Sequence, residues 1–589
     1  MARSTTPAGI GYKDKHDLND KVFTPADSEF VAVTVDSAVR GVHTELDRVK
    51  ELAEAVLAMS GIGPTSPVDA QTAALINQAE TLTRKAVNAV VETAKVSAFG
   101  VRVDAYGVVG DGVTDDTTAF HAAAAAAATA GVPLVIPAGF SIGISSYKQL
   151  PDGLILVTNG SSFQQIVPMG RNPVVGLGSR CQVLGGLYVR TLGGDNCQGV
   201  HVPPASNGAS VDVIDVRSSA SGAGAATVYD NGVRILGSNF TCGRIVVEGY
   251  TWPVWVQGYG HEIGWLEVKE YSLAVRLYDT KHLRIHGGRV YGTSPTTAYK
   301  AGYNGVLIEA SAPDAVDGVH VSNFRVEDAG EHGYRVGGQN SVRNVTFTRC
   351  VAKNVGGSGF KTLPGPAGDA GNSVRATGVV LDHCTVEDAG DINQNCSGFL
   401  IQRADDVRIT APSIRKKDKL FSAVEGIRMS GVTHVTVTDA KVRDTKNFGV
   451  HLDEAYGNVS DIRVTGHIET TTGQGVYLQN PGVQFRDIHV DMYVENTTVG
   501  GSAFYAGRAT AAEDSGSWAG MNTLRLTISE STPSPTSINP NSSSTALSAF
   551  FADVIGRRAW IVPFRAGSMW TDTRTLTRQV KRADDWAVL

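Results

Sequence analysis

The chain has 589 residues, of which 42% are hydrophobic, 19% are charged and 7% are aromatic, and its formal net charge is -6. A chain of this length is too long to fold around one ordinary hydrophobic core, so several domains or a repeat architecture are expected. The apolar content argues against wholesale disorder, and a negative balance argues against a general nucleic-acid partner.

The cysteines and the N-terminus exclude further classes. The six cysteines form no CxxC pair and no zinc-like spacing, so the sequence predicts no metal site, no cofactor and no disulfide framework. The first residues, MARSTTPAGIGYKDKHD, lack the charged start and apolar run of a secretion signal. No apolar run reaches about 18 residues, so we expect no membrane insertion. We therefore expect a soluble protein that is made in a cytoplasm and that needs a route other than a secretion signal if it works outside a cell.

Residues 28–60 have the heptad pattern of a coiled coil, because apolar side chains recur at alternating spacings of four and three. Valine stands at every d position, and valine, leucine and alanine stand at the a positions, a pattern that disfavours two strands and favours three or four. The alternative is an amphipathic helix that folds against its own chain. A linker at 60–67 separates this helix from a weaker one at 69–97. The seam consists of Val35, Val39, Val42, Leu46, Val49, Ala53 and Val56.

Residues 103–144 are predicted to form a strand, a glycine-rich turn, a helix and a buried strand. Asp115 or Asp116 should cap the helix, which runs through Phe120 and ends at Gly131. This segment resembles the N-terminal cap of the pectate lyase-like superfamily, which includes many bacteriophage tail spikes. The resemblance implies a right-handed parallel β-helix whose open end this segment covers. It implies no reaction, because the cap carries no catalytic group.

Behind this segment a glycine followed by an apolar, a variable and an apolar residue recurs many times. From Gly333 to Gly475 the intervals run from 23 to 39 residues, as expected for coils of a β-helix. Stacked coils bury their apolar faces in one continuous core. The glycines are Gly199, Gly232, Gly305, Gly333, Gly359, Gly398, Gly426, Gly449 and Gly475, with Pro253 and Ala274 in the same slot and Gly501 closing the series.

A second strand repeats upstream of each glycine and ends in Asp, Asn or Thr, as in FRVED and CTVED. Cys350 and Cys384 share one column of this strand and are predicted to be inward core residues. The column of Asp328, Asn354 and Asp388 has two interpretations. Asp and Asn favour turns, but a stack of carboxylates also suits a catalytic site.

The variable residue of each glycine motif should point outward, because alternate side chains of a strand face opposite sides. The resulting row consists of His201, Arg234, Trp255, Arg276, Leu307, Arg335, Lys361, Leu400, Arg428, His451 and Tyr477. Cations and aromatic rings beside amides suit an extended, partly anionic glycan, since arginine binds carboxylates in a bidentate manner. The alternatives are a solvated face or a face buried between subunits. The candidate substrate-binding residues are Arg234, Trp255, Arg276, Arg335, Lys361, Arg428, His451 and Tyr477.

The candidate catalytic residues are four carboxylates, Glu327, Asp328, Glu387 and Asp388. Inverting hydrolysis needs two carboxyls about 6.5–9.5 Å apart, and two coils separate Asp328 from Asp388 by roughly 10 Å. A lyase would instead need a base such as Lys361 or Arg335. The catalytic motifs of the polygalacturonase branch are absent, so the resemblance transfers no catalytic residue. Hydrolysis, elimination and the absence of any reaction all stay open.

Tryptophans mark a small C-terminal module with two expected strands, AWIVPF and TRTLTRQV, whose role is either a trimer clamp or a sugar contact. The predicted divisions are an N-terminal attachment segment (1–27), a helical stem (28–98), a cap (99–150), a β-helix (151–530), a linker (531–545) and this module (546–589).

With the resemblance, this organisation implies a homotrimeric bacteriophage tail spike or tail fibre. Such a protein is assembled in the host cytoplasm, is carried on the virion and joins other tail or baseplate proteins through its N-terminus. Its implied ligand is a bacterial surface polysaccharide, which it binds and which it is a candidate to depolymerise. The alternatives are a non-catalytic receptor-binding or structural fibre and a free polysaccharide lyase or glycoside hydrolase.

Overall fold

The computed structural model describes most of the chain from the predicted cap onward. The described residues are 96–97, 100–192, 198–219, 230–271, 273–292, 301–365, 373–390, 396–416, 425–453, 455–471, 473–479, 485–497, 504–507, 524–530, 538–540, 569–572, 577–581 and 586–588. The attachment segment and the heptad seam therefore lie outside the described residues. Of the predicted stem, only β1 (Val96–Ser97) is described, and the predicted linker contains one strand, β38 (Ile538–Pro540).

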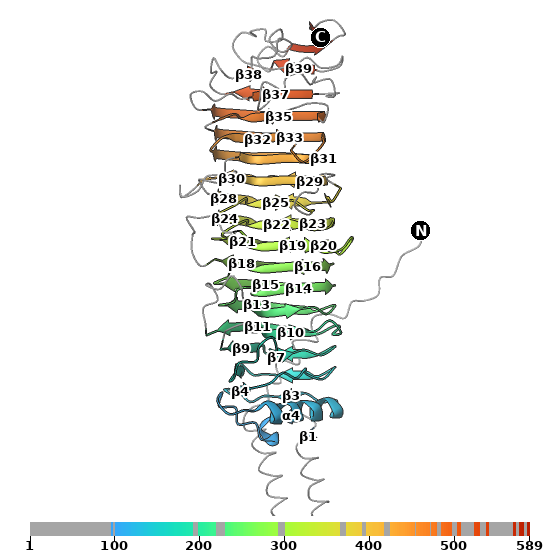
Figure 1. Ribbon diagram of the computed structural model, residues 1–589, viewed down its shortest axis with the longest axis vertical. Helices are drawn as coiled ribbons and strands as arrows, with labels where there is room; N and C mark the ends of the chain where they lie inside the picture. The colour runs from blue at the N-terminus through green and yellow to red at the C-terminus, as the bar shows by residue number, and fades with distance from the viewer. Residues whose placement is uncertain are drawn as a thin grey trace, which may run out of the picture.

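The described strands stack into a long shaft in which almost every strand pairs in parallel with the strand one coil earlier (Figure 1). The pairings follow three series, which we call the first, second and third faces in their order along each coil. This topology is a parallel β-helix, the fold that the repeat predicted. Its right-handed sense is the one that crossover geometry favours.

The first face is built from the strands that follow the glycines. It comprises β7 (Pro173–Gly176), β10 (Gln198–Val202), β12 (Asn231–Ile235), β14 (Val254–Tyr259), β16 (Val275–Lys281), β19 (Val306–Ala310), β22 (Tyr334–Gly338), β25 (Phe360–Thr362), the starts of β29 (Ser397–Thr410) and β31 (Glu425–Thr445), β32 (Phe448–Asp453), β34 (Val476–Gln479), β36 (Phe504–Gly507) and β38.

The second face is built from short strands that the sequence did not reveal. It comprises β2 (Gly100–Arg102), β3 (Leu134–Val135), β5 (Ile155–Val157), β8 (Gln182–Leu184), the starts of β11 (Ser210–Ser218), β13 (Thr241–Glu248) and β15 (Glu262–Lys269), then β17 (Arg284–Ile285), β20 (Val316–Ser322), β23 (Val342–Thr348), β26 (Ala376–Thr377), β27 (Val380–Asp382), parts of β29, β31, β33 (Val459–Thr471), β35 (Phe485–Thr497) and β37 (Leu524–Glu530), and β39 (Met569–Asp572).

The third face contains the strands of the FRVED type. It comprises β4 (Ser141–Ile144), β6 (Ser162–Gln165), β9 (Leu187–Thr191), the ends of β11, β13 and β15, β18 (Gly288–Tyr291), β21 (Phe324–Glu327), β24 (Val351–Val355), β28 (Thr385–Ala389), β30 (Ser413–Arg415) and the ends of β31, β33, β35 and β37. The prediction of two strands per coil was therefore incomplete, because each full coil has three.

A side chain would clash at several glycines of the column, whereas Pro253 and Ala274 fill the same slot in two coils lower in the shaft. A Cβ on Gly449 would lie 2.6 Å from the carbonyl oxygen of Gly475 and 2.6 Å from Cδ1 of Ile468. The same double clash, with the next glycine's carbonyl oxygen and with an aliphatic side chain of the third face, occurs at Gly426. Gly501 lies outside the described residues, and the residue that pairs with Val476 in the next coil is Phe504.

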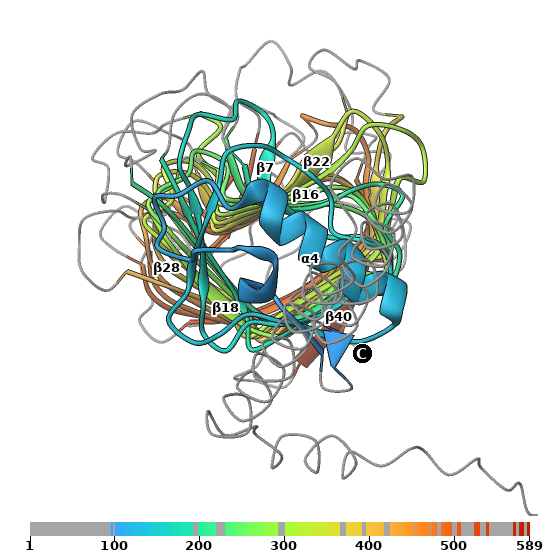
Figure 2. The ribbon, with the colours of Figure 1, turned by 90° about the horizontal axis from the view of Figure 1, so that it is seen from below.

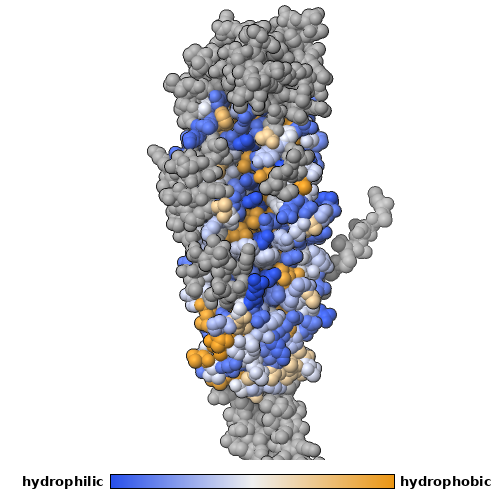
Figure 3. Space-filling view, viewed as in Figure 1, coloured by the Kyte–Doolittle hydropathy of each residue, from blue (hydrophilic) through white to orange (hydrophobic). Residues whose placement is uncertain are grey.

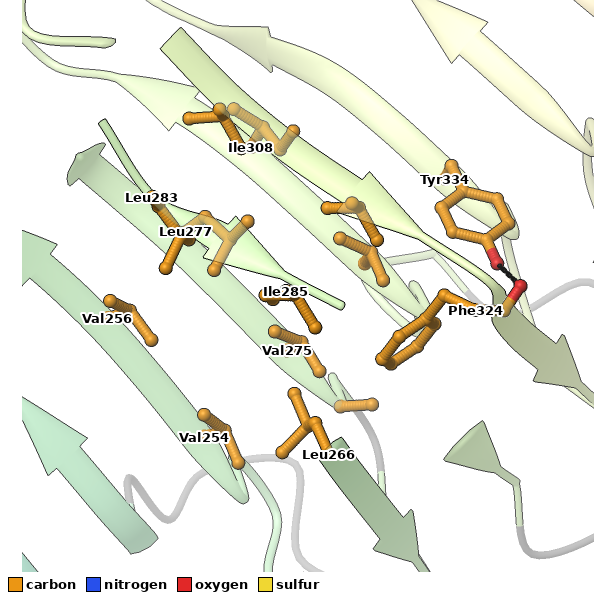
Figure 4. Close-up of a cluster of buried hydrophobic side chains, with 14 of the residues drawn as sticks. Val254, Val256, Leu266, Val275, Leu277, Leu283, Ile285, Ile308, Phe324 and Tyr334 are labelled. Carbon is orange, nitrogen blue, oxygen red and sulfur yellow. Dashed lines mark hydrogen bonds between the residues drawn. The ribbon is translucent and has the colours of Figure 1, made fainter. Parts of the chain in front are cut away.

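The core is a set of in-register ladders. Tyr334 stacks on Phe360, and Phe360 stacks on Phe399, with ring centroids 4.5 and 5.0 Å apart. The Tyr334 hydroxyl donates a 2.7 Å hydrogen bond to the carbonyl oxygen of Phe324, which satisfies the one polar atom of this ladder (Figure 4). Aliphatic residues such as Val254 and Leu277 continue the filling between coils.

The cysteines and the Asp/Asn column take the predicted structural positions. Cys350 and Cys384 are fully buried, as are Cys181, Cys242 and Cys396 to within a few per cent; Cys197 lies outside the described residues. Burial raises the pKa of the Cys181 and Cys242 thiols to about 12. The turn residues have left-handed backbones, with φ of 59° at Asp328, 50° at Asn354 and 53° at Asp388, a conformation that Asp and Asn tolerate.

Helix α4 (Thr117–Ala130) covers the lower end of the shaft, as Figures 1 and 2 show. Gly131 ends it in a left-handed conformation, as predicted. Asp116 occupies the N-cap position, as predicted, but its carboxylate does not cap the helix, because it accepts hydrogen bonds from the amides of Val109 and Gly110. The carboxylate of Asp115 accepts from the amide of Thr117 instead. A short 3₁₀ helix, η1 (Asp104–Tyr106), precedes this turn.

At the upper end, β39, β40 (Thr577–Lys581) and β41 (Trp586–Val588) pair in an antiparallel manner. The strand predicted at TRTLTRQV corresponds to β40, whereas AWIVPF lies outside the described residues. On the face displayed in Figure 3, polar residues dominate and apolar residues gather toward the lower end. No helix among the described residues is long and apolar enough to cross a membrane.

Candidate functional site

The predicted outward row is present on the first face. Every side chain from His201 to Tyr477 lies opposite the next one in the strand register. Val200 and Val202, which flank His201, are fully buried, so the row does face outward. It is less exposed than a solvated row would be, because its side chains pack on one another. Four of its members are at most 9% exposed: Leu307, Leu400, His451 and Tyr477.

The lower part of the row is an aromatic platform. Trp255 contacts Trp252 and Tyr278, with ring centroids 5.7 and 5.6 Å apart. The guanidinium of Arg276 lies 4.5 to 5.0 Å from the centroids of all three rings. Arg276 Nε also donates a 2.8 Å hydrogen bond to Glu309 Oε2. Arg276 is therefore already neutralised, and its main role is to hold the rings.

Arg234, which lies next to this platform, and Trp255, which belongs to it, each have a polar atom without a hydrogen-bond partner among the described residues. The guanidinium of Arg234 lies 5.2 Å from the centroid of Trp255. Within the described part of the chain, neither Arg234 Nε nor Trp255 Nε1 has a hydrogen-bond partner. Burial, and secondly the charge of Arg234, lower the pKa of His201 to about 4.

The upper part of the row is a buried polar network. Glu425 Oε1 lies 2.7 Å from His451 Nδ1, and His451 Nε2 lies 3.0 Å from Gln479 Oε1. Arg428 Nε donates a 2.6 Å hydrogen bond to Asp453 Oδ2. The ring of His451 stacks on Tyr477, with centroids 4.8 Å apart. Arg428 and His451, both predicted to bind substrate, are thus engaged with carboxylates of the chain itself.

The middle of the row differs from its lower and upper parts, because most N–H groups of its two cations form no hydrogen bond to a described residue. Arg335 and Lys361 lie opposite each other on neighbouring strands. One carboxylate oxygen, Oε1 of Glu331, lies 3.7 Å from Arg335 Nη1, which is too long for a hydrogen bond.

The predicted catalytic carboxylates do not lie on this face. Glu327 and Glu387 belong to the outer side of the third face, two coils apart, with Lys353 between them. Glu327 is bonded to Arg325, and Glu387 is bonded to Arg415. Both carboxylates are therefore rungs of an ion-pair ladder.

Asp328 and Asp388 lie at the corner that leads from the third face to the next strand of the first face. Asp388 is 1% exposed. Burial raises the pKa of Asp328, and the charge of Glu327 raises it further, whereas a hydrogen bond from Asn354 opposes the rise. A raised pKa favours the protonated form of the Asp328 carboxyl.

Two acids beside the row were not predicted, Glu331 and Glu425. Glu425 stands directly before Gly426, and Glu331 stands two residues before Gly333. The sequence did contain a pattern that pointed to this position, since the residue before each glycine is often polar, and in the structure it is buried. That column includes Asn304, His332, Ser358, Ser397 and Glu425.

No protein-family model matches the sequence, and no curated protein matches it. Similar solved structures include the catalytic unit of a GH87 α-1,3-glucanase from Streptomyces thermodiastaticus, with 16% identity and a TM-score of 0.42 over 74% of this chain and 69% of that one. The Dettilon tailspike protein has 12% identity and a TM-score of 0.40 over 75% and 70%. A surface adhesin of Streptococcus pneumoniae has 12% identity and a TM-score of 0.33 over 83% and 98%. Likeness at this level does not reveal what this chain binds.

Proposed function

We propose that this chain is a bacteriophage tail spike or tail fibre that binds a bacterial surface polysaccharide along the first face. The observation that carries the proposal is the aromatic platform of Trp252, Trp255 and Tyr278. Sugar rings present C–H groups on their faces, which pack on aromatic rings, while their hydroxyls need hydrogen-bond partners. The Trp255 Nε1–H and Arg234 Nε–H groups at this platform are buried and have no hydrogen-bond partner among the described residues.

The assembly state rests on the sequence. The heptad seam at 28–60 favours three or more strands, so we propose a homotrimer whose N-terminal segment joins other tail proteins on the virion. A rigid shaft fits this role, because stacked parallel strands of fixed register hold a binding row at a set distance from the attachment point.

The test is binding of purified protein to surface polysaccharides extracted from a panel of bacteria, measured by biolayer interferometry. Trp255→Ala should weaken binding roughly 10- to 30-fold, as expected for a buried aromatic anchor. The matched control is Trp265→Ala, a tryptophan of β15 that is 38% exposed and outside the row. Failure of the parent to bind any polysaccharide or any cell of the panel would overturn the proposal.

Depolymerisation is a second candidate function, favoured by the raised pKa of Asp328. In this version Asp328 is the acid, and Glu327, Glu387 or Asp388 is the second carboxylate. A bound polysaccharide should then lose viscosity and release reducing ends or unsaturated uronates. A polysaccharide that binds and stays intact would identify a receptor-binding fibre without turnover.

A further inference from the structure

We propose that Glu331, His332, Arg335 and Lys361 form a subsite for one anionic group of a sugar, so that the bound polysaccharide is an acidic one. This inference rests on the proposed function, and it narrows the ligand from polysaccharides in general to those that carry carboxylate, sulfate or phosphate groups.

The first step is that the other paired cations of the row are already neutralised. Arg276 is bonded to Glu309 at 2.8 Å, and Arg428 is bonded to Asp453 at 2.6 Å. A glycan anion at either position would have to displace a carboxylate of the chain. Arg335 and Lys361 have no hydrogen-bonded carboxylate among the described residues, so they are the cations in the middle of the row that can bind an added anion.

The second step is the register. Arg335 and Lys361 are consecutive rungs, and Leu307 and Leu400 are the rungs on either side of them. Both leucines are 7% exposed, whereas the Arg335 side chain is 30% exposed. Parallel strands stack about 4.8 Å apart, which allows two cationic groups to reach one oxyanion. The apolar rungs exclude water around it and strengthen the attraction.

The third step is the shortage of partners. Arg335 Nε has no hydrogen-bond partner within the described ranges. No carboxylate among those residues lies within ion-pair distance of Lys361. Burial, and secondly the charge of Arg335, lower the pKa of Lys361, and Glu331 only partly offsets this. Glu331 offsets one of the two positive charges, and an added anion would balance the other.

The fourth step concerns the two groups behind the cations. Glu331 Oε2 accepts hydrogen bonds from the amide of Gly302 at 2.8 Å and from Asn304 Nδ2 at 2.9 Å, which fixes the carboxylate in place. His332 Nδ1 accepts a hydrogen bond from the amide of Ser358 at 2.9 Å, so its proton lies on Nε2. Nε2 is buried and lies 3.4 Å from Glu331 Oε1, although it forms no hydrogen bond to any described residue. The subsite thus has one neutral N–H group beside the Glu331 carboxylate and one excess positive charge.

The experiment observes Lys361 directly in the full-length protein. Lysines are labelled by reductive ¹³C-methylation, and the Lys361 signal is identified by its loss in the Lys361→Arg variant. Sodium glucuronate should shift this signal, and glucose should not. A response to glucuronate alone indicates a carboxylate subsite, and a response to inorganic sulfate or phosphate as well indicates a subsite that also accepts esters. The inference is overturned if no anion shifts the signal, or if the shift is the same in Arg335→Gln.

A second arm separates this inference from the proposed function. Arg335→Gln and Lys361→Gln should each weaken binding of an acidic polysaccharide from the panel roughly 10- to 100-fold. The matched control is Arg408→Gln, an exposed arginine of the second face with the same charge change. If the parent binds a polysaccharide equally well before and after chemical reduction of its carboxyl groups or removal of its esters, the subsite is wrong while the proposed function stands. If the parent binds no polysaccharide, the proposed function fails, and the lysine signal alone decides the subsite.

Discussion

Glu425 and His451 share a 2.7 Å contact between Oε1 and Nδ1, and their side chains are 4% and 3% exposed. Ser397 Oγ donates to the other Glu425 oxygen at 2.6 Å, and Gln479 contacts the far nitrogen of His451. These four residues stand on four consecutive coils. The outer side of the first face is therefore tied from coil to coil by side chains as well as by its backbone ladder.

Glu425→Ala should destabilise this part of the shaft by about 3–5 kcal/mol, because it leaves buried partners of the carboxylate unpaired. Denaturant midpoints of the parent and the variant measure the effect. The matched control is Glu309→Ala, which breaks a pair whose side chains are 23% and 18% exposed and should cost about 1 kcal/mol or less. Equal losses in the two variants would contradict the assignment of a buried network.

Gly449→Ala should destabilise the fold by about 1–3 kcal/mol, because its Cβ would overlap backbone that cannot move aside. The control is Gly337→Ala, where the nearest atom to a new Cβ, the Leu363 carbonyl oxygen, lies at 3.2 Å. Thermal melts of the two variants should therefore differ. A Gly449→Ala protein that melts with the parent would show that the column is not a packing requirement.

Asp328→Asn should keep the fold, because Asn354 already adopts the same left-handed backbone one coil later. If Asp328 is a general acid, the variant should bind polysaccharide like the parent and lose about 10²- to 10⁴-fold in the rate of product release. Asn354→Asp serves as a control that alters the same column. Unchanged turnover in Asp328→Asn would exclude this aspartate as the acid.

Stability should fall as the pH drops from about 6.5 toward 4, partly through His121 on α4. Burial, and secondly Lys148, lower the pKa of His121 to about 4. The unfolded state therefore binds a proton at a higher pH than the folded state does. The stabilisation of the folded state by neutral His121 is complete above the ordinary histidine pKa of 6.5 and is lost as the pH falls toward 4. The loss from this group reaches up to about 3 kcal/mol. His121→Gln should flatten the dependence of the melting temperature on pH in this window, and an unchanged slope would contradict the assignment.

The double variant Val42→Glu, Val49→Glu should dissociate the predicted trimer, because it places unpaired charge in the heptad seam at a cost of several kcal/mol. Sedimentation velocity of the full chain measures this. If the oligomer is the same before and after the change, the β-helix and not the coil holds the chains together.

The first face could be predicted because its signal reflects a steric limit. A side chain at Gly426 or Gly449 would clash with its neighbours, so the glycines mark most coils and fix which residues lie on the row. The second face could not be predicted in this way. Its strands bend at a left-handed corner, at Gly318 and Asn344 for example, and the bend breaks the alternation of apolar and polar residues that identifies a strand.

The row itself could be predicted, but its chemistry could not. Which cations are free depends on carboxylates that reach the row from other coils, as Asp453 does for Arg428 and Glu309 does for Arg276. These partners are separated by 25 and 33 residues. No local pattern indicates such a pairing, so Arg276, Arg335 and Arg428 were equivalent in the sequence and differ in the structure.

The helix that covers the lower end has a consequence for how copies of this chain meet. A parallel stack ends in unpaired backbone groups, which form a template for a strand of another copy. Helix α4 packs across β2, β3 and β4 at that end, and Phe120 anchors it against Phe163 with ring centroids 5.4 Å apart. Because the helix covers these backbone groups, no strand of another copy can add to this end of the stack. Without it, growth from one molecule to the next would need no new interface, and the product would be a fibre of indefinite length.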